Sequence, residues 1–502
     1  MNYILAHDLG TTGNKSTLID TTGKPVATEF EPYSTAYPHP NWAEQSAADW
    51  ERALIGCSRR LLAPGTIVPE QIAAVSFSGH MQGALVVDAQ GKPLRPAIIW
   101  ADQRATPQAE FMSRSCGEDT IYRLSGHRVS PAYTAAKVLW VRDNQPDIYQ
   151  RTVWVLQPKD YAAWLLTGVI ATDYSDASGT QVFDLQQRRW SDELLRAFDL
   201  RADIFPPVHP STTIIGRVTP AAAQTTGLLA GTPVVIGGGD GACATVGSGA
   251  IREGDAYTYI GSSSWLALST RRPIFDPARR IINFAHLDPM LYFSLGNMQA
   301  AGGALDWLER LLRDSGVAAP QHAALDALAG SVPPGARGVL CLPYFLGERC
   351  PHWNPQARAV FAGLSMAHGR AEMVRAVLEG VAFNMRWILD VLRAEGIPIR
   401  SMRVIGGGMR SALWRQILAD TYNMPLLRPQ LDSAATSLGA AIAGGIGVGL
   451  FPDFGVVEQL IPAEPAERPD PDRNARYERL YPLFQQTYAA LKPIFDALAD
   501  LE

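Results

Sequence analysis

The chain has 502 residues, 47% of them hydrophobic, and a formal net charge of -5 from 44 basic and 49 acidic side chains. At roughly 100–200 residues per domain this length suggests about two to four domains. The near balance of charge, without a basic block, argues against a nucleic-acid-binding protein. The start, MNYILAHDLG, lacks the features of a secretory signal, and no run of about 18 apolar residues predicts a membrane span. The five cysteines form no CxxC pair, which favours reduced thiols and a cytoplasmic location over disulfides or a zinc site.

In the first half of the chain, apolar strands alternate with turns and helices, a pattern typical of an α/β fold. Segment 3–20 predicts a strand, a tight Gly-Thr-Thr-Gly turn and a second strand. Segment 159–168 predicts a helix that stops at Gly168. Further strands are predicted at 72–79, 95–105 and 232–240.

The second half repeats this pattern. Segment 256–270 again predicts strand, turn and strand, and 402–422 predicts a strand, a turn of three glycines and a helix with Ser411 near its start. The tail, 474–501, predicts one or two amphipathic helices interrupted by Pro482 and Pro493. The repeated pattern indicates an internal duplication that forms two α/β lobes with an active-site cleft between them. We place the boundary near 247–254, which gives domains 1–247 and 248–502.

The first turn, DLGTTGNK, has the residues of a phosphate-binding hairpin. Its backbone N–H groups and the hydroxyls of Thr11 and Thr12 form a tight arc, and glycine allows close approach. Asp8, at the end of the first strand, is a candidate Mg²⁺ ligand. A plain hairpin with a solvated aspartate is the alternative. The similar turn IGSSSW at 260–265 favours the phosphate reading, because two such hairpins, one per lobe, could hold a nucleotide's phosphates from both sides.

Three glycines in VIGGGMRSALWRQ, at 404–416, leave a flat surface without side chains on which an adenosine can lie. Packing of a helix on a strand explains one or two such glycines, and three favour nucleotide contact.

A separate match, Gly239-x-Gly241-x-x-Ala244, resembles a dinucleotide fingerprint. The glycines that follow it would break the helix of a Rossmann unit, and no GxxxxGK[ST] P-loop occurs, so both of these alternatives are rejected.

Asp240 lies in the glycine-rich stretch TPVVIGGGDGACATVG. With little side-chain bulk around it, its carboxylate could accept a proton from an attacking hydroxyl, a contribution of roughly 10²–10⁴ in rate. An aspartate that caps the following helix is the alternative, and the residues alone do not decide between the two.

Together these motifs resemble those of the FGGY carbohydrate kinases, a family of the actin-like ATPase superfamily, and most closely its xylulokinase branch. The resemblance covers nearly the whole chain, and its motifs occur in the family's order. Ala132 departs from the usual leading residue of the family's first signature. The further segments that carry the resemblance are WAEQ at 42–45, TAAKVLWVRDN at 134–144, SDASGTQVFD at 175–184, LPYFLGERCPHWNP at 342–355 and AVFAGLSMAHGRAEMVRAVLE at 359–379.

The resemblance implies two RNase H-like lobes that close on ATP·Mg²⁺ and a small-molecule sugar. It implies that Asp240 is the catalytic base, that Asp8 lies beside the metal, and that D-xylulose is converted to D-xylulose 5-phosphate. The residues that it assigns to ATP are Thr11, Thr12, Lys15, Gly261, Ser262, Ser263, Gly407, Gly408 and Ser411. Those that it assigns to the sugar are His80, Met81, Gln82, Trp100, Asp102, Arg104 and Gly241.

Two departures keep other substrates open. Where the xylulokinase sugar loop commonly reads Gln-Met-His-Gly, this chain reads His-Met-Gln-Gly at 80–83, and Gly241 replaces the usual asparagine after the catalytic aspartate. Another ketose, a polyol or an aldonate is therefore the alternative substrate. His80 packed and hydrogen-bonded in the core is the structural alternative for that residue. A nucleotide-dependent switch or scaffold is the alternative from another class, and analogy with the family suggests a homodimer.

Overall fold

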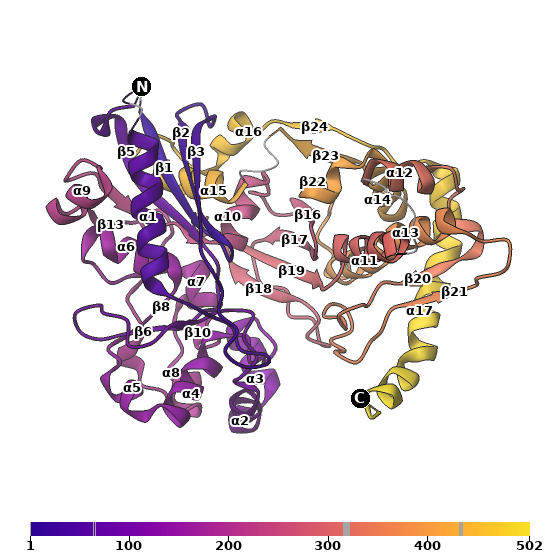
Figure 1. Ribbon diagram of the computed structural model, residues 1–502, viewed down its shortest axis with the longest axis horizontal. Helices are drawn as coiled ribbons and strands as arrows, with labels where there is room; N and C mark the ends of the chain where they lie inside the picture. Colours follow the sequence, from indigo (N-terminus) through magenta and orange to yellow (C-terminus); the bar gives the residue numbers. More distant parts are fainter. Residues whose placement is uncertain (1, 64, 66, 315–321, 431–434, 502) are drawn as a thin grey trace.

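The computed structural model describes residues 2–63, 65, 67–314, 322–430 and 435–501. Its strands form two large sheets, one in each half of the chain, and the two lobes lie side by side (Figure 1). The long final helix, α17 (Pro471–Ala499), runs along the outer side of the second lobe.

The first lobe is built on a seven-stranded sheet. Its first three strands pair antiparallel, the first of them is parallel to the strand Ile72–Gly79, and that strand is parallel to Pro233–Val235. Buried apolar side chains fill both of its faces, so helices must cover both. The strand order is β13 (Ile214–Arg217), β14 (Pro233–Val235), β5 (Ile72–Gly79), β1 (Tyr3–Leu9), β2 (Gly13–Asp20) and β3 (Pro25–Pro32), with β15 (Gly238–Gly239) also paired to β5.

The second lobe repeats this topology. Antiparallel strands again lead into two parallel ones, which is the RNase H-like arrangement, and the predicted duplication into two α/β lobes is confirmed. The strand order is β18 (Ile282–Ala285), β19 (Tyr292–Met298), β17 (Ser264–Thr270), β16 (Ala256–Ile260), β22 (Met402–Ile405), β23 (Leu426–Pro429) and β24 (Ala463–Pro465).

Two helices cross where the lobes meet. They are α10 (Asp240–Gly247) and α15 (Ala435–Gly447), and α15 also packs on β1 and β5 of the first sheet. Their backbones touch, because a Cβ on Gly439 would lie 2.1 Å from the carbonyl oxygen of Cys243. The second half of the chain therefore supplies a helix to the core of the first lobe.

The remaining elements surround these sheets. The other helices are α1 (Ala47–Leu62), α2 (Thr106–Cys116), α3 (Glu118–Ser125), α4 (Thr134–Asn144), α5 (Pro146–Arg151), α6 (Pro158–Thr167), α7 (Tyr174–Ser178), α8 (Asp192–Ala197), α9 (Pro220–Thr226), α11 (Gly302–Asp314), α12 (His322–Gly330), α13 (Arg370–Arg393), α14 (Ala412–Tyr422) and α16 (Val457–Leu460). The short strands are β4 (Glu44–Gln45), β6 (Leu85–Val87), β7 (Ala97–Ile98), β8 (Trp154–Leu156), β9 (Thr172–Asp173), β10 (Phe183–Asp184), β11 (Arg189–Trp190), β12 (Val208–His209), β20 (Leu340–Leu342) and β21 (Val360–Ala362).

The structure corrects three sequence-based expectations. The strand predicted at 95–105 is reduced to the two residues of β7. The strand predicted at 232–240 is interrupted at Gly237, which adopts a left-handed φ of 66°, and Asp240 begins helix α10 instead of ending a strand. The tail forms one continuous helix, in which Pro482 and Pro493 lie on the exposed face. The buried aromatic side chains on its other face hold it against the lobe.

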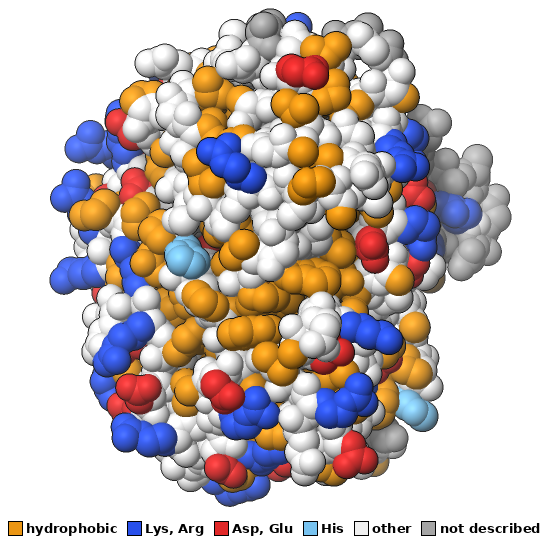
Figure 2. Space-filling model, turned by 90° about the vertical axis from the view of Figure 1, so that its left-hand side faces the viewer, with side chains coloured by type: hydrophobic (Ala, Val, Ile, Leu, Met, Phe, Trp, Pro, Cys, Tyr) orange, Lys and Arg blue, Asp and Glu red, His pale blue; other side chains and the backbone are white. Residues whose placement is uncertain are grey.

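Figure 2 looks onto the outer side of the first lobe, where hydrophobic side chains form a band between scattered charged groups. Exposed hydrophobic residues of this lobe include Val169, Ile214 and Leu229. Among the residues described, none of the helices combines the length and the apolar character needed to cross a membrane.

Candidate active site

Asp240 is the first residue of α10, directly after the short strand β15. Its side chain is half-buried, and its Oδ1 accepts a hydrogen bond of 2.7 Å from the backbone N–H of Gly241. Burial, and secondarily the negative charge of Asp8, raise the pKa of Asp240 to about 7, although the Gly241 N–H opposes the shift. A carboxyl group with this pKa can exchange a proton near neutral pH.

Asp8 lies near the end of β1, beside the hairpin turn. Its Oδ2 accepts a 2.5 Å hydrogen bond from the hydroxyl of Thr436 on α15 and lies 3.9 Å from the Lys15 ammonium. Its Oδ1 accepts no hydrogen bond from the residues described. The two carboxylates, Asp8 and Asp240, therefore lie at the ends of two strands of one sheet, β1 and β15, which both pair with β5.

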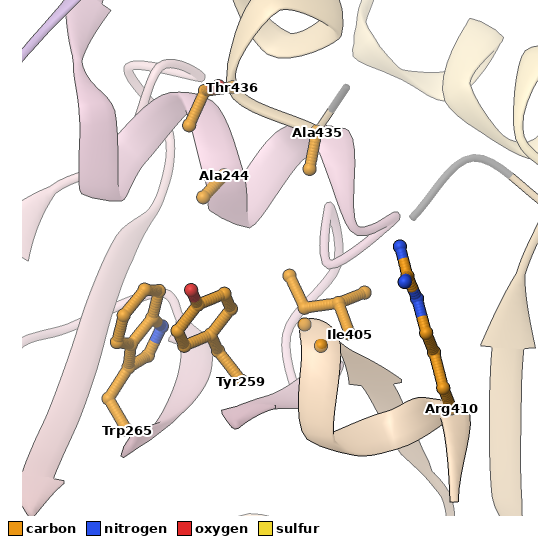
Figure 3. Close-up of a pocket in the computed structure, with 9 residues that line it drawn as sticks. Ala244, Tyr259, Trp265, Ile405, Arg410, Ala435 and Thr436 are labelled. Carbon is orange, nitrogen blue, oxygen red and sulfur yellow. The ribbon is translucent and has the colours of Figure 1, made fainter. Parts of the chain in front are cut away.

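A cavity of about 330 Å³ opens between the lobes (Figure 3). Side chains of α10 and α15 line one side of it, and strands β16, β17 and β22 line the other. Its size is in the range of sites for small ligands. The lining residues are Ala244, Tyr259, Trp265, Ile405, Gly406, Gly407, Arg410, Ala435 and Thr436.

This cavity adjoins both carboxylates. Ala244 lies one helical turn after Asp240, and Thr436 is the residue whose hydroxyl bonds Asp8. On the opposite wall, the rings of Tyr259 and Trp265 are stacked with centroids 4.0 Å apart. The Arg410 side chain extends along one end of the cavity, as Figure 3 shows.

Of the three residues predicted to contact adenosine at the glycine turn, one lines this cavity and two do not. Gly407 lines it, and a Cβ there would meet no atom within 4 Å. Gly408 instead allows close packing, because a Cβ would lie 2.7 Å from Cγ2 of Ile260. The Ser411 hydroxyl caps α14 by accepting the N–H of Trp414 at 3.0 Å.

The two hairpin turns lie at corresponding places in the two sheets. In the first turn, the Thr11 hydroxyl accepts a hydrogen bond from Trp100 Nε1 at 3.0 Å, and Thr12 is exposed. In the second turn, Ser262 and Ser263 are exposed, while the carbonyl groups of 261–262 accept N–H groups from the start of α11. Both turns therefore keep hydroxyl groups accessible at the end of a rigid strand pair.

The predicted sugar loop follows β5. His80 is buried, its Nε2 lies 3.2 Å from Gln45 Oε1, and its Nδ1 has no hydrogen-bond partner among the described residues. Burial lowers the pKa of His80 to about 3, so the ring is neutral. Gln82 adopts a left-handed φ of 68°, and its carbonyl oxygen accepts a 2.6 Å hydrogen bond from the buried Lys137. Met81 packs against Gly239, beside Asp240.

The other predicted sugar residues differ in accessibility. Trp100 is 37% exposed, whereas Asp102 and Arg104 form a buried ion pair with Nη2 and Oδ2 2.7 Å apart. Both Asp102 oxygens are occupied, because one also accepts the N–H of Ala43 at 2.6 Å. The Arg104 guanidinium lies 3.7 Å from the ring centroid of Trp42. This pair is part of the buried wall of the first lobe, and Trp100 is its accessible neighbour.

Most of the glycines around Asp240 are required by close packing of the backbone and do not leave free space beside its carboxylate. A Cβ on Gly237 would lie 2.0 Å from the carbonyl oxygen of Phe77, and one on Gly239 would lie 2.5 Å from Met81 Sδ. At Gly241 the nearest atom would be Phe293 Cζ, at an ordinary 3.5 Å. Only Gly241 therefore has room for a side chain, and apolar groups face it.

Of the nine residues that line the cavity, only Gly407 was among the predicted site residues. The eight that sequence reasoning missed include Tyr259, Trp265, Arg410 and Thr436. Trp265 and Arg410 are inside motifs that were identified as nucleotide-binding, so their position was a usable signal. Thr436 had no such signal, because it meets Asp8 across 428 positions of sequence.

The fold defines the class of protein: two RNase H-like lobes, the architecture of the actin-like ATPases. The model of the FGGY family of carbohydrate kinases, N-terminal domain, matches residues 3–247, and the model of its C-terminal domain matches residues 256–448. The chain therefore belongs to the FGGY family of carbohydrate kinases, as the sequence motifs predicted, and it is an enzyme of that class and not a scaffold.

Individual relatives agree with this assignment. The chain is 36% identical to the xylulose kinase of Escherichia coli K12 over 489 residues, covering 97% of this chain and 99% of the relative. The crystal structure of xylulose kinase from Rhodospirillum rubrum matches with a TM-score of 0.91 and 31% identity, covering 99% of this chain and 100% of that one. A gluconate kinase from Lactobacillus acidophilus matches with a TM-score of 0.93 and 26% identity, over 99% of both chains.

Proposed function

We propose that this kinase transfers the γ-phosphoryl group of ATP to D-xylulose, forming D-xylulose 5-phosphate and ADP, with Asp240 as the general base. The observation that carries the proposal is the position of Asp240. Its carboxyl group has a pKa of about 7, lies near the carboxylate of Asp8, and precedes by one helical turn the wall of the interlobe cavity.

The chemistry follows from this arrangement. The ionised Asp240 accepts the proton of the sugar hydroxyl as the hydroxyl oxygen bonds to the γ-phosphorus of ATP. The bond between that phosphorus and the β–γ bridging oxygen breaks, and ADP leaves with the electron pair. Transfer of this kind depends mainly on positioning and charge stabilisation, which two lobes on either side of one cavity can supply.

The residues beside Asp240 fit a magnesium ion. Asp8 is half-buried, and one of its oxygens accepts no hydrogen bond from the described part of the chain, while Mg²⁺ prefers one or two carboxylates together with phosphate oxygens and water. The described residues contain no cluster of three potential ligands, so phosphate oxygens and water would have to complete the coordination of the ion. When bound, Mg²⁺ neutralises charge on the transferring phosphoryl group. In this proposal Asp8 holds the ion, and Lys15 adds positive charge.

The cavity is the proposed nucleotide site. Its apolar walls of Tyr259, Trp265 and Ile405 suit an adenine ring, and Arg410 supplies a cation for a phosphate or ribose group. Gly407, without a side chain, allows a flat ligand to approach the backbone. The exposed hydroxyls of both hairpins are proposed to contact the phosphates.

The identity of the sugar is tested by an ADP-release screen over ketoses, polyols and aldonates at equal concentration. We expect the highest kcat/KM with D-xylulose. The second candidate is another ketose, a polyol or an aldonate, which the altered residues His80, Gln82 and Gly241 keep open. Higher kcat/KM with gluconate or a polyol than with D-xylulose would overturn the substrate assignment and leave the kinase assignment intact.

The base assignment is tested with Asp240→Asn. We expect sugar-dependent ADP release to fall by roughly 10²–10⁴, while ADP binding, measured by calorimetry, stays close to wild type. Asp288→Asn is a matched control, because that carboxylate lies in a turn of the second lobe and bonds the N–H of Met290. Retained turnover in the Asp240 variant would contradict the assignment.

We also propose a cytoplasmic location and a homodimer. A supply of ATP supports the location, and the apolar band on the outer side of the first lobe (Figure 2) supports self-association. Cell fractionation and light scattering test these proposals. A monomer at micromolar concentration would contradict the second one.

A further inference from the structure

A buried charged cluster lies behind the active site of the first lobe. The ammonium group of Lys159, on α6, lies 2.7 Å from Oδ1 of Asp160, 3.0 Å from Oδ1 of Asp173 and 3.2 Å from Oδ2 of Asp176. All four side chains are at most 1% exposed. Burying four ionisable groups carries a large desolvation cost, and well-packed apolar residues could fill the same volume.

The cluster connects to the catalytic residue through one serine. Asp173 uses its Oδ2 to accept hydrogen bonds from the hydroxyl of Ser175 at 2.6 Å and from its N–H at 2.9 Å. The Ser175 oxygen in turn accepts the backbone N–H of Gly239 at 2.9 Å. Gly239 directly precedes Asp240 and is the N-cap of α10, so this bond fixes the point from which the Asp240 side chain projects.

The same segment also contacts the predicted sugar loop. Gly79, at the end of β5, packs so closely on Lys159 that a Cβ would lie 3.1 Å from Cβ of that lysine. Gln157, the N-cap of α6, accepts the N–H of Gly83 at 2.8 Å and donates to its carbonyl oxygen at 3.0 Å. Both ends of the loop are therefore held by the start of the helix that carries Lys159.

We propose that the buried Lys159–Asp173 ion pair, acting through the hydroxyl of Ser175, positions the catalytic carboxylate of Asp240 relative to the sugar loop. Ser175 is then a positioning residue. The proposal rests on the function proposed for Asp240, which the Asp240→Asn variant tests separately.

The physical reason lies in what Ser175 is bonded to. The lysine orients the carboxylate of Asp173, the carboxylate orients the serine hydroxyl as a donor, and the serine oxygen is left to accept from Gly239. Without that acceptor the buried N–H of Gly239 loses its partner, and the first turn of α10 can shift. Because phosphoryl transfer requires close alignment, a shift of about 1 Å can lower the rate by roughly 10²-fold.

The test compares Ser175→Ala with Ser211→Ala. Ser211 is a matched control, because its hydroxyl also donates to Oδ2 of Asp173, at 2.7 Å, whereas the N–H of Gly239 bonds Ser175. We expect kcat to fall by roughly 10-fold in Ser175→Ala with the KM for ATP unchanged, and kcat to stay within about twofold of wild type in Ser211→Ala. Both variants lose one buried hydrogen bond to the same carboxylate, and Ser175→Ala also leaves the N–H of Gly239 unpaired, so its melting temperature should fall further than that of Ser211→Ala.

Two further variants make the result decisive. Ser175→Cys keeps the volume and replaces the hydroxyl by a weak acceptor, so it should reproduce the loss of kcat even if the alanine variant folds poorly. In an Asp240→Asn background, Ser175→Ala should cause no further loss, because there is no catalytic carboxylate left to position. Equal kcat values for the Ser175 and Ser211 variants would overturn the proposal, as would full additivity with Asp240→Asn. Turnover retained by Asp240→Asn alone would instead overturn the base assignment.

Discussion

At the scale of single residues, the protonation of Asp240 determines the pH range of the reaction. The base must be ionised to accept a proton, and the pKa of this carboxyl is about 7 because of burial and the charge of Asp8. We therefore expect log kcat/KM for the sugar to fall with a slope of one as the pH decreases below about 7. Steady-state kinetics between pH 5 and 9 measure this. A profile that is flat from pH 5.5 to 8 would contradict it.

The pKa of Lys137 is also lowered to about 7, by burial. Its deprotonation affects the opposite side of the profile, because the ammonium form holds the carbonyl oxygen of Gln82 and is lost as the pH rises. The acid side of the profile therefore reports Asp240. Lys137→Met removes this donor at every pH, so we expect it to lower kcat/KM throughout and to abolish the alkaline decline, while the acid side keeps its slope.

The same raised pKa has a consequence for stability. A carboxyl whose pKa is higher in the folded state than in the unfolded state favours folding at low pH, and this contribution is lost as the pH rises from about 4 to 7. Asp240→Asn should therefore raise the free energy of unfolding by about 1–2 kcal/mol at pH 8, allowing for partial exposure, and by much less at pH 4. Urea denaturation at both pH values measures it. A destabilised variant at pH 8 would be inconsistent with the raised pKa.

The glycines around Asp240 provide a test of packing. Gly237→Ala combines a left-handed φ of 66° with a Cβ placed 2.0 Å from the carbonyl oxygen of Phe77. We expect it to destabilise the fold by about 2 kcal/mol or more. Gly241→Ala meets only ordinary contacts and should stay within about 0.5 kcal/mol of wild type. Thermal unfolding compares the two variants, and equal melting temperatures would refute this account of the stretch.

At the scale of elements, the strand pairs and helix ends with local signals were predictable. The hairpin at 3–20, the helix that ends at Gly168 in a left-handed conformation, and the Ser411 cap of α14 all follow from nearby residues. The continuous helix of the tail was not predictable. A proline within a helix predicts an interruption, but the buried Tyr477, Phe484 and neighbouring aromatic residues keep α17 continuous by tertiary packing.

Pro482 should therefore cost stability in the middle of α17. It has no N–H to bond the carbonyl of Glu478, and its ring crowds that turn. Pro482→Ala should raise the free energy of unfolding by about 1 kcal/mol, since part of the gain is offset by the more flexible unfolded chain. Pro471→Ala is the control, because Pro471 is the first residue of the helix, where no N–H is needed. A Pro482 variant with a lower melting temperature than wild type would show that the proline is required.

At the scale of the whole molecule, the duplication was predictable from the repeated pattern, but the composition of the site was not. The carboxylates, the two hairpins and the glycine turn each carry a local signal. Thr436 and the crossing of α10 over α15 depend on how distant segments pack, and no local pattern records such contacts. The buried ion pair of Asp102 with Arg104 was also not predictable, since the spacing of the two residues suits a sugar site and a structural ion pair equally well.

The crossing of α10 and α15 determines the distance between the two halves of the site. Asp240 begins α10, and Thr436, which bonds Asp8 and lines the cavity, is near the start of α15. A Cβ on Gly439 would lie 2.1 Å from the carbonyl oxygen of Cys243, so Gly439→Ala must push the helices apart. We expect a loss of about 1–3 kcal/mol in stability and a decrease in kcat of roughly 10-fold or more, because the catalytic base moves relative to the bound nucleotide.

The control is Val377→Ala, at a residue buried in α13 of the second lobe. It should lose comparable stability with kcat unchanged at 25 °C. Kinetics and urea denaturation of both variants decide the matter, and a Gly439 variant with wild-type kcat would show that the lobes tolerate a wider crossing.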